Sequence, residues 1–281
     1  MNLKNYCLYK MNTDWITANY DKLKFLKLKD LHIPGSHDSA AYKVDFDLCS
    51  IFKEPYLGPL FKFLSLVPCI TRKFTRTQNL SIYEQLRLGA RYIDLRICKL
   101  NGIYHCSHTY ICDKLVNVLD QIKIFNSQYP KEIIIINYNP DYYYRDTVDM
   151  QIVGNYIINY FDSTNKNITW DTDPSVPFNQ TIETLIKDGP IIPIYNIHTV
   201  WLNKNNMIDF AKNYPKELSA NFYGINCVLT PNTHTNFLLE SLYNYSLDMN
   251  KFIVKQPITF MIYAFDYVNT TVVDFIISKN F

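Results

Sequence analysis

Apolar residues in the 281-residue chain gather in short runs, which alternate with longer segments where they recur every three or four positions. The short runs are typical of buried parallel strands, and the periodic segments are typical of amphipathic helices. We predict strands at Leu28–Ile33, Tyr92–Ile97, Ile103–Cys106, Glu132–Tyr138, Pro190–Tyr195, Tyr223–Leu229 and Ile258–Phe265. Helices are predicted at Ile82–Leu88, Leu115–Gln128, Thr147–Tyr160, Ile182–Lys187, Phe237–Tyr245 and Thr271–Ser278.

Strands that alternate with helices through short connections indicate a (β/α) barrel. The pattern supplies seven strands where a regular barrel of this type has about eight, and we place the missing strand around Ile168–Trp170. No linker, repeat or low-complexity block interrupts the chain. We therefore predict a single α/β domain over residues 1–281, folded as a distorted TIM-type barrel.

One segment, residues 47–76, fits no element of such a barrel. Its apolar part, Leu48–Ile70, is rich in Phe, Leu and Tyr, is interrupted by Pro55, Pro59 and Pro68, and precedes several basic residues. Apolar side chains beside cations suit a lipid interface, so we expect this insertion to provide a peripheral membrane contact. The alternative is that it folds back as an additional helix covering the core.

Composition narrows the class of protein. Hydrophobic residues make up 48% of the chain and charged residues 19%, which suits a sizeable core and not a disordered chain. A net charge of +2 without a basic block gives no reason to expect nucleic-acid binding. Seven irregularly spaced cysteines do not suggest a disulfide framework, and no secretory signal or long membrane-spanning run is seen. We expect a cytoplasmic protein that can associate peripherally with membranes.

Candidate chemistry begins where the first predicted strand ends. Pro34 and Gly35 read as a turn, and His37 and Asp38 follow at once. Both side chains would then project from the carboxyl end of a strand, which is where α/β folds keep their active sites. The alternative is a histidine that only satisfies a loop.

A second stretch combines charge with strand periodicity. Alternation places Tyr92, Asp94 and Arg96 on one side of the strand, and aliphatic residues on the other. An aspartate and an arginine two positions apart can bond each other and still present a guanidinium to an anion. A structural ion pair on an edge strand is the alternative.

A third stretch carries two histidines, His105 and His108. With Cys106 and Cys112 they could be read as a zinc site. However, the spacing matches no standard zinc motif, and a strand would splay the side chains apart. We therefore expect no zinc there.

Taken together, these stretches resemble the X-domain of phosphatidylinositol-specific phospholipase C (PI-PLC), in its bacterial and X-domain-containing form. The matching pieces are Ile33–Ser39, Gln78, Gln85–Arg96 and Ser107–Thr109, in that order. The resemblance is dense from about residue 12 to residue 140 and thinner afterwards.

The resemblance implies a role for each charged residue. His37 would be the base that activates the inositol 2-hydroxyl, and His108 the acid that protonates the diacylglycerol oxygen. Asp38 would orient His108 and favour its charged form. Arg96 would bind the phosphate, and Asp94 would hold Arg96 or a neighbouring histidine.

Further positions follow from the same resemblance. His105 competes with His108 for the role of the acid, and we prefer His108 because Thr109 follows it. Asp266 matches a late carboxylate that pairs with His37. The substrate-binding positions would be Asn139, Asp141, Tyr195 and Asn196, although the last two stand where bacterial enzymes have an arginine.

The resemblance also bears on metal use. Calcium-dependent relatives have carboxylates around Asp94 and Arg96 and an asparagine at the position of Asp38. A guanidinium in the place of the cation would repel calcium and do the same electrostatic work on the phosphate. We therefore predict no metal and no cofactor.

The leading interpretation is a metal-independent phosphodiesterase or lyase that acts on a phosphoinositide or a related phospholipid through a cyclic inositol phosphate. The alternative is a catalytically idle X-domain that serves as a lipid- or protein-binding module. Nothing in the sequence fixes the oligomeric state, and we expect a monomer.

Overall fold

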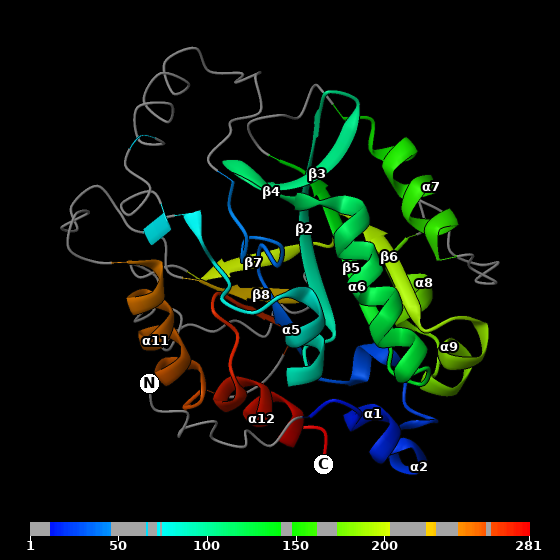
Figure 1. Ribbon diagram of the computed structural model, residues 1–281. Helices are drawn as coiled ribbons and strands as arrows, with labels where there is room; N and C mark the ends of the chain where they lie inside the picture. The colour runs from blue at the N-terminus through cyan, green and yellow to red at the C-terminus, as the bar shows by residue number, and fades with distance from the viewer. Residues whose placement is uncertain are drawn as a thin grey trace, which may run out of the picture.

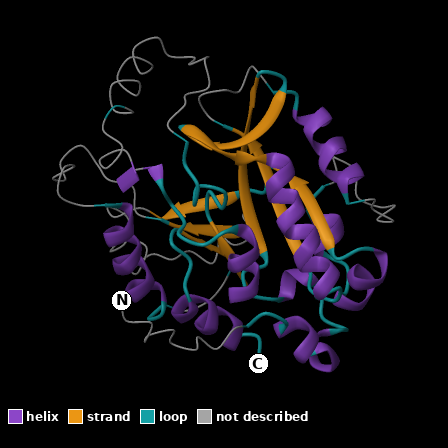
Figure 2. Cartoon of the chain, viewed as in Figure 1, coloured by secondary structure: helices purple, strands orange, loops and turns teal. Residues whose placement is uncertain are grey.

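Strands lie at the centre of the molecule and helices surround them on the outside (Figure 1, Figure 2). The computed structural model describes residues 12–45, 66, 72–73, 75–141, 148–161, 173–202, 223–228, 241–256 and 260–281. Among the helices of these residues, none has both the length and the apolar character that crossing a membrane requires.

In the described residues, parallel strands follow one another in the order β6-β5-β2-β1-β9-β8-β7. Neighbours in the sheet are thus also neighbours along the chain, and β9 returns to pair with β1, as in a (β/α) barrel. No ladder between described residues joins β6 to β7, so the sheet does not close there. The predicted distorted TIM-type fold is confirmed. The strands are β1 (Ile33–Ser36), β2 (Tyr92–Leu100), β5 (Ile134–Pro140), β6 (Ile191–Tyr195), β7 (Thr199–Leu202), β8 (Gly224–Cys227) and β9 (Ile262–Phe265).

Two further strands run antiparallel. The strand β3 (Ile103–His108) pairs with β2, and β4 (Tyr110–Lys114) pairs with β3. The expectation that the segment around Ile103–Cys106 is a parallel strand was wrong, because Asn101 and Gly102 both adopt positive φ angles, of 49° and 80°. Two such residues form the tight turn that folds neighbouring strands into a hairpin.

Capping residues in the sequence explain where several of the helices begin or end. Ser81 and Glu84 form a capping box at the start of α5, and Gly89 ends that helix in the left-handed conformation, with φ of 119°. Asp149, Ser241 and Asn269 accept backbone hydrogen bonds at the starts of α7, α11 and α12. The helices are α1 (Trp15–Ala18), α2 (Tyr20–Leu23), α5 (Ile82–Leu88), α6 (Leu115–Gln128), α7 (Met150–Tyr160), α8 (Ser175–Phe178), α9 (Ile182–Asp188), α11 (Leu242–Ile253) and α12 (Thr270–Ser278).

The first strand differs from its prediction. Leu28–Asp30 forms one turn of 3-10 helix, and the strand covers Ile33–Ser36, so Pro34 and Gly35 lie inside it and do not end it. A Cβ on Gly35 would come within 2.7 Å of the Tyr92 side chain. Glycine is therefore needed for the close approach of β1 to β2.

Other boundaries differ in detail. The helix predicted from Thr147 begins at Met150, after the Asp149 cap. The helix predicted over Phe237–Tyr245 begins at Leu242 and runs on to Ile253. Neither β4 nor β7 was predicted, and the segment Ile168–Trp170 lies outside the described residues.

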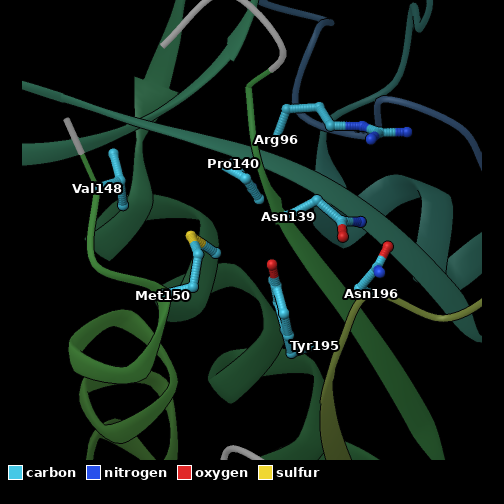
Figure 3. Close-up of a pocket in the computed structure, with 7 residues that line it drawn as sticks. All are labelled: Arg96, Asn139, Pro140, Val148, Met150, Tyr195 and Asn196. Carbon is cyan, nitrogen blue, oxygen red and sulfur yellow. The ribbon is translucent and has the colours of Figure 1, made fainter. Parts of the chain in front are cut away.

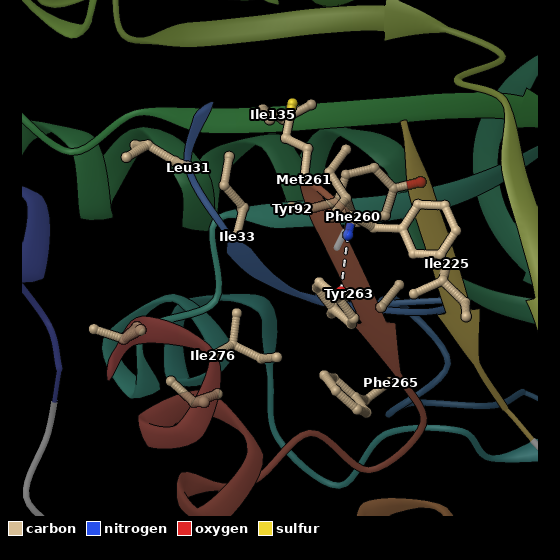
Figure 4. Packing of buried hydrophobic residues seen from close by; sticks show 14 of the residues in the cluster. Leu31, Ile33, Tyr92, Ile135, Ile225, Phe260, Met261, Tyr263, Phe265 and Ile276 are labelled. Carbon is tan, nitrogen blue, oxygen red and sulfur yellow. Dashed lines mark hydrogen bonds between the residues drawn. The ribbon is translucent and has the colours of Figure 1, made fainter. Parts of the chain in front are cut away.

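Two apolar layers flank β2. Ile93, Leu95 and Ile97 pack in one cluster with α6, while Tyr92 belongs to the other cluster, with β1, β9 and α12. Figure 4 shows part of this second cluster, where the backbone N–H of Phe260 donates to the Tyr263 hydroxyl at 2.9 Å. The predicted alternation along β2 is confirmed, and Asp94 and Arg96 lie on the side opposite α6.

Candidate active site

Four strands bring six charged or titratable side chains together. His37 and Asp38 follow β1, Asp94 and Arg96 lie in β2, His108 ends β3, and Asp266 follows β9. The carboxyl end of β1 pairs in parallel with the end of β9 and with the first residues of β2, so the residues that follow β1 and β9 lie beside Asp94 and Arg96. The structure therefore gathers the six residues that the sequence analysis named as catalytic.

His37 is the most enclosed of the histidines in this cluster. Its side chain is 4% exposed, and its Nδ1 lies 2.9 Å from Oδ1 of Asp266. Its Nε2 lies 3.4 Å from Oδ2 of Asp38 and 4.0 Å from Oδ2 of Asp94. Asp266 thus holds one ring nitrogen and leaves the other directed at the carboxylates.

Asp38 is the centre of the cluster. Its Oδ2 lies 3.4 Å from Nε2 of His108 as well as from Nε2 of His37. Its Oδ1 accepts a hydrogen bond from Nε of Arg96 at 3.3 Å. The residue adopts a φ of 40°, a conformation that costs energy in any residue other than glycine and that aspartate tolerates better than most. Strain of this kind is common at functional sites.

Asp94 and Arg96 contact each other, as their spacing predicted. Nη2 of Arg96 donates to Oδ2 of Asp94 at 3.3 Å, and Nδ2 of Asn137 donates to Oδ1 of the same carboxylate at 2.9 Å. The Asp94 side chain is 1% exposed, whereas that of Arg96 is 26% exposed. Two carboxylates thus fix the position of the Arg96 guanidinium, and its side chain remains partly exposed to solvent.

The two candidate acids of β3 occupy different environments. Nδ1 of His108 lies 2.8 Å from the carbonyl oxygen of Thr75, and its side chain is 28% exposed. His105 lies opposite Cys98 of β2 and Lys114 of β4. Burial and the positive charge of Lys114 lower the pKa of His105. His108, and not His105, faces Asp38.

The carboxylates set the protonation of the cluster. Burial by itself would lower the pKa of His37, but the negative charges of Asp38, Asp266 and Asp94 outweigh it and raise this pKa to about 9. Burial opposes ionisation of Asp38, yet both histidines and Arg96 lower its pKa to about 2. Burial raises the pKa of Asp266, although His37 opposes that shift. The carboxylates thus favour the protonated form of His37.

A pocket of about 530 Å³ adjoins the cluster. Arg96 belongs to both, so the pocket opens beside this residue. Figure 3 shows the side chains of Asn139, Tyr195 and Asn196 grouped on one side of it. The remaining lining residues are apolar: Pro140, Val148 and Met150. One wall can thus exchange hydrogen bonds and the other can contact carbon–hydrogen groups.

Asp141, the fourth position named for substrate binding, lies elsewhere. It is 3% exposed, and its Oδ2 accepts a hydrogen bond from the Ser107 hydroxyl at 2.6 Å. This bond ties the end of β5 to β3. Leu48–Ile70 lies outside the described residues except for Leu66, whose side chain is 75% exposed.

Sequence reasoning missed two supporting groups and gave a third, Gln78, no role. The carbonyl of Thr75 orients His108, the amide of Asn137 orients Asp94, and the amide of Gln78 contacts the backbone of His37. Every residue type has a backbone carbonyl, so the contact of Thr75 cannot be recognised from the sequence. Asn137, in contrast, is a polar residue that directly follows four isoleucines inside a strand, and that signal was available.

Three side chains of the cluster lie close enough together to bind one metal ion. One ligand atom each from His37, Asp38 and Asp94 lie within 4.8 Å of one another. The same two carboxylates already accept hydrogen bonds from Arg96. A cation at this point would lie beside a fixed positive charge, so the arrangement does not favour one.

Comparison with known proteins was made by sequence and by structure, and no family model matches the chain. A PI-PLC X-box domain-containing protein of Dictyostelium discoideum is 34% identical over 125 residues, which are 44% of this chain and 16% of that protein. The human PI-PLC X domain-containing protein 2 is 37% identical over 143 residues, covering 47% of this chain and 44% of the relative. The 1-phosphatidylinositol phosphodiesterase of Listeria monocytogenes is 29% identical over 187 residues, covering 66% and 49%.

The fold is similar over nearly the whole chain. The PI-PLC of Staphylococcus aureus aligns with a TM-score of 0.63 at 16% identity, covering 96% of this chain and 98% of that one. The enzyme of Listeria monocytogenes aligns with a TM-score of 0.62 at 20% identity, covering 96% and 99%. The curated relatives are matched over less than half of their own length. The resemblance drawn from the sequence motifs is confirmed.

Proposed function

Because the chain resembles the PI-PLC X-domain family in its motifs and has the fold of the bacterial enzymes, we propose that it is a phosphodiesterase or lyase that cleaves phosphatidylinositol or a related phospholipid. One observation carries the proposal. Two histidines present Nε2 to the same oxygen of Asp38, and a guanidinium lies against the other oxygen. Cleavage of a phosphodiester beside a hydroxyl needs this set: a base, an acid and a positive charge for the phosphoryl oxygens.

In the proposed first step, Nε2 of His37 takes the proton of the inositol 2-hydroxyl as its oxygen attacks phosphorus. The bond from phosphorus to the diacylglycerol oxygen breaks, and Nε2 of His108 protonates that oxygen. Arg96 binds the phosphoryl oxygens as their charge rises. The product is a cyclic inositol phosphate, which water then opens with the two histidines in reversed roles.

The hydrogen bonds at Nδ1 support these assignments. In His37 this atom contacts Asp266, and in His108 it contacts the Thr75 carbonyl. A carbonyl oxygen can only accept, so Nδ1 of His108 carries a hydrogen and Nε2 is the nitrogen left for proton transfer. The same reasoning applies to His37 whenever Asp266 is ionised.

We propose that the reaction needs no metal ion. Arg96 donates to Asp38 and Asp94, which are the carboxylates that a divalent cation would have to use. Burial opposes the charge of Arg96, but Asp94 and Asp38 hold its pKa above the usual value, so it stays positive. The guanidinium then supplies to the phosphate the charge that calcium would supply.

The pocket beside Arg96 is the proposed site of the headgroup. Asn139, Asn196 and Tyr195 offer amide and phenol partners to ring hydroxyls, while Arg96 holds the phosphate at the boundary between pocket and cluster. Asp141 has no part in this proposal as a direct contact, because Ser107 binds its carboxylate. The Leu48–Ile70 insertion is proposed, from its sequence alone, to contact the lipid surface.

The test is release of headgroup phosphate from vesicles of labelled phosphatidylinositol by the purified protein, with EDTA present. We expect turnover in wild type and its loss in His37→Ala. Binding to the vesicles without turnover would instead favour the idle lipid-binding module and contradict the proposal.

A further inference from the structure

Gln78 is a buried glutamine whose side-chain amide contacts only backbone groups. Its exposure is 0%. Nε2 donates to the carbonyl of His37 at 2.9 Å and to the carbonyl of Phe265 at 2.8 Å. Oε1 accepts from the N–H of Val268 at 3.1 Å. Both donors and the acceptor of one amide are thus used in a single buried position.

The backbone partners of Gln78 belong to, or lie next to, the two residues of one proposed catalytic pair, His37 and Asp266. The His37 carbonyl belongs to the proposed base itself, whereas Phe265 and Val268 stand on either side of Asp266 and its neighbour in sequence. The backbone N–H of His37 also donates to the Phe265 carbonyl at 3.0 Å. Gln78 therefore clamps the end of β1 to the turn that follows β9.

Neighbours of Gln78 reinforce the clamp. The hydroxyl of Thr77 donates to the carbonyl of Asp38 at 3.0 Å. The N–H of Tyr267, which has a φ of 47°, donates to the carbonyl of Thr77 at 2.6 Å. The turn after β9 is thus held from two adjacent residues of one extended segment.

We propose that Gln78 is a positioning residue that fixes Asp266 against Nδ1 of His37 and so sets the proton affinity of that imidazole. The inference rests on the proposed function, because it matters for catalysis only if His37 is the base. The argument is geometric: the His37–Asp266 contact joins two loops from strands β1 and β9, and Gln78 hydrogen-bonds to both loops.

The experiment measures the titration of the His37 ring by NMR in the protein without substrate. The variants are Gln78→Met, which keeps the length, and Gln78→Leu, which is shorter; both remove all three hydrogen bonds of the side-chain amide and add no charge. Asp266→Asn gives the full effect of losing the carboxylate. A buried glutamine outside the clamp, Gln85, is the matched control, since its Nε2 donates to the carbonyls of Ser39 and Leu80 and its exposure is also 0%.

We expect the pKa of His37 to fall by roughly one unit in the Gln78 variants, in the direction of Asp266→Asn, as when an opposite charge moves out of contact. Gln85→Met should lower the thermal stability to a similar extent and leave the His37 titration in place. An unchanged titration in a folded Gln78 variant would overturn the inference. If one variant fails to fold, the other decides the question by the same criterion.

The readout separates this inference from the proposed function. A shifted titration in a protein that cleaves no lipid would support the clamp and contradict the enzyme. An unshifted titration in a protein that cleaves lipid would do the reverse.

Discussion

Nε2 of His37 and Nε2 of His108 lie at the same distance, 3.4 Å, from a single oxygen of Asp38. The two rings reach this oxygen from different strands, β1 and β3, and each is held at Nδ1 by a partner of its own. One carboxylate can therefore stabilise a proton on either ring. Such an arrangement suits a reaction in which a proton is taken up at one histidine and given up at the other.

The two histidines of β3 provide a matched pair of variants. His108→Ala removes the proposed acid and should lower the rate by about 10²–10⁴-fold, which is the usual contribution of one acid or base. His105→Ala should change the rate little, because that ring lies beside Lys114 and not beside Asp38. The check is the initial rate on phosphatidylinositol vesicles, with thermal melting as the folding control. Near-wild-type turnover of the His108 variant would contradict the assignment.

The dependence of kcat/KM on pH tests the identity of the base. The base His37 works in its deprotonated form and the acid His108 in its protonated form, so the profile should be bell-shaped. The carboxylates raise the pKa of His37 to about 9, which sets one of the two limbs. Asp266→Asn removes one of these negative charges, and the midpoint of that limb should move to lower pH. The profile of kcat/KM reports the free enzyme and is the measurement to use. A midpoint that Asp266→Asn leaves in place would show that another group is the base.

Arg96 allows a test of metal use. Turnover by the wild-type protein should persist in EDTA, and added calcium should not increase it, because the guanidinium already binds both carboxylates. Arg96→Asp should lose activity, and calcium should restore part of it. A wild-type enzyme that EDTA abolishes and calcium restores would contradict this account.

The insertion before Gln78 yields a prediction from sequence alone. Replacing Phe61 and Phe63 with Ser should weaken binding to vesicles, since each buried CH₂ contributes about 0.8 kcal/mol to interfacial binding. Turnover of vesicle substrate should fall, whereas hydrolysis of soluble cyclic inositol phosphate should not. A joint loss of both activities and of thermal stability would mean that the segment belongs to the core.

Local patterns were enough to predict part of the site. Alternation along one strand placed Asp94 and Arg96 on a common face, and the turn-like Pro34-Gly35 drew attention to His37 and Asp38. The structure brings these residues together, but the predicted turn was wrong, because Gly35 serves the close contact with Tyr92 inside the strand.

The sequence pattern alone could not predict contacts between residues that are far apart in the chain. The pairing of His37 with Asp266 depends on β1 lying beside β9, and these residues are far apart in the sequence. Only the family resemblance suggested it. Asn101 and Gly102, in contrast, are a recognised sequence signal for a hairpin turn, and β2 runs up to this turn, three residues past its predicted end at Ile97.

Backbone contacts could not have been predicted at all. The Thr75 carbonyl that orients His108 could belong to any residue type, and the partners of Gln78 are likewise main-chain groups. Their positions depend on how three loops meet at one edge of the sheet.

The most direct measurement is a phosphorus NMR time course of the purified protein on phosphatidylinositol in EDTA. The account predicts that a cyclic inositol phosphate resonance appears first and gives way to inositol phosphate, and that neither forms with His37→Ala. Direct formation of inositol phosphate without the cyclic species, or no reaction in wild type that still binds the lipid, would contradict it.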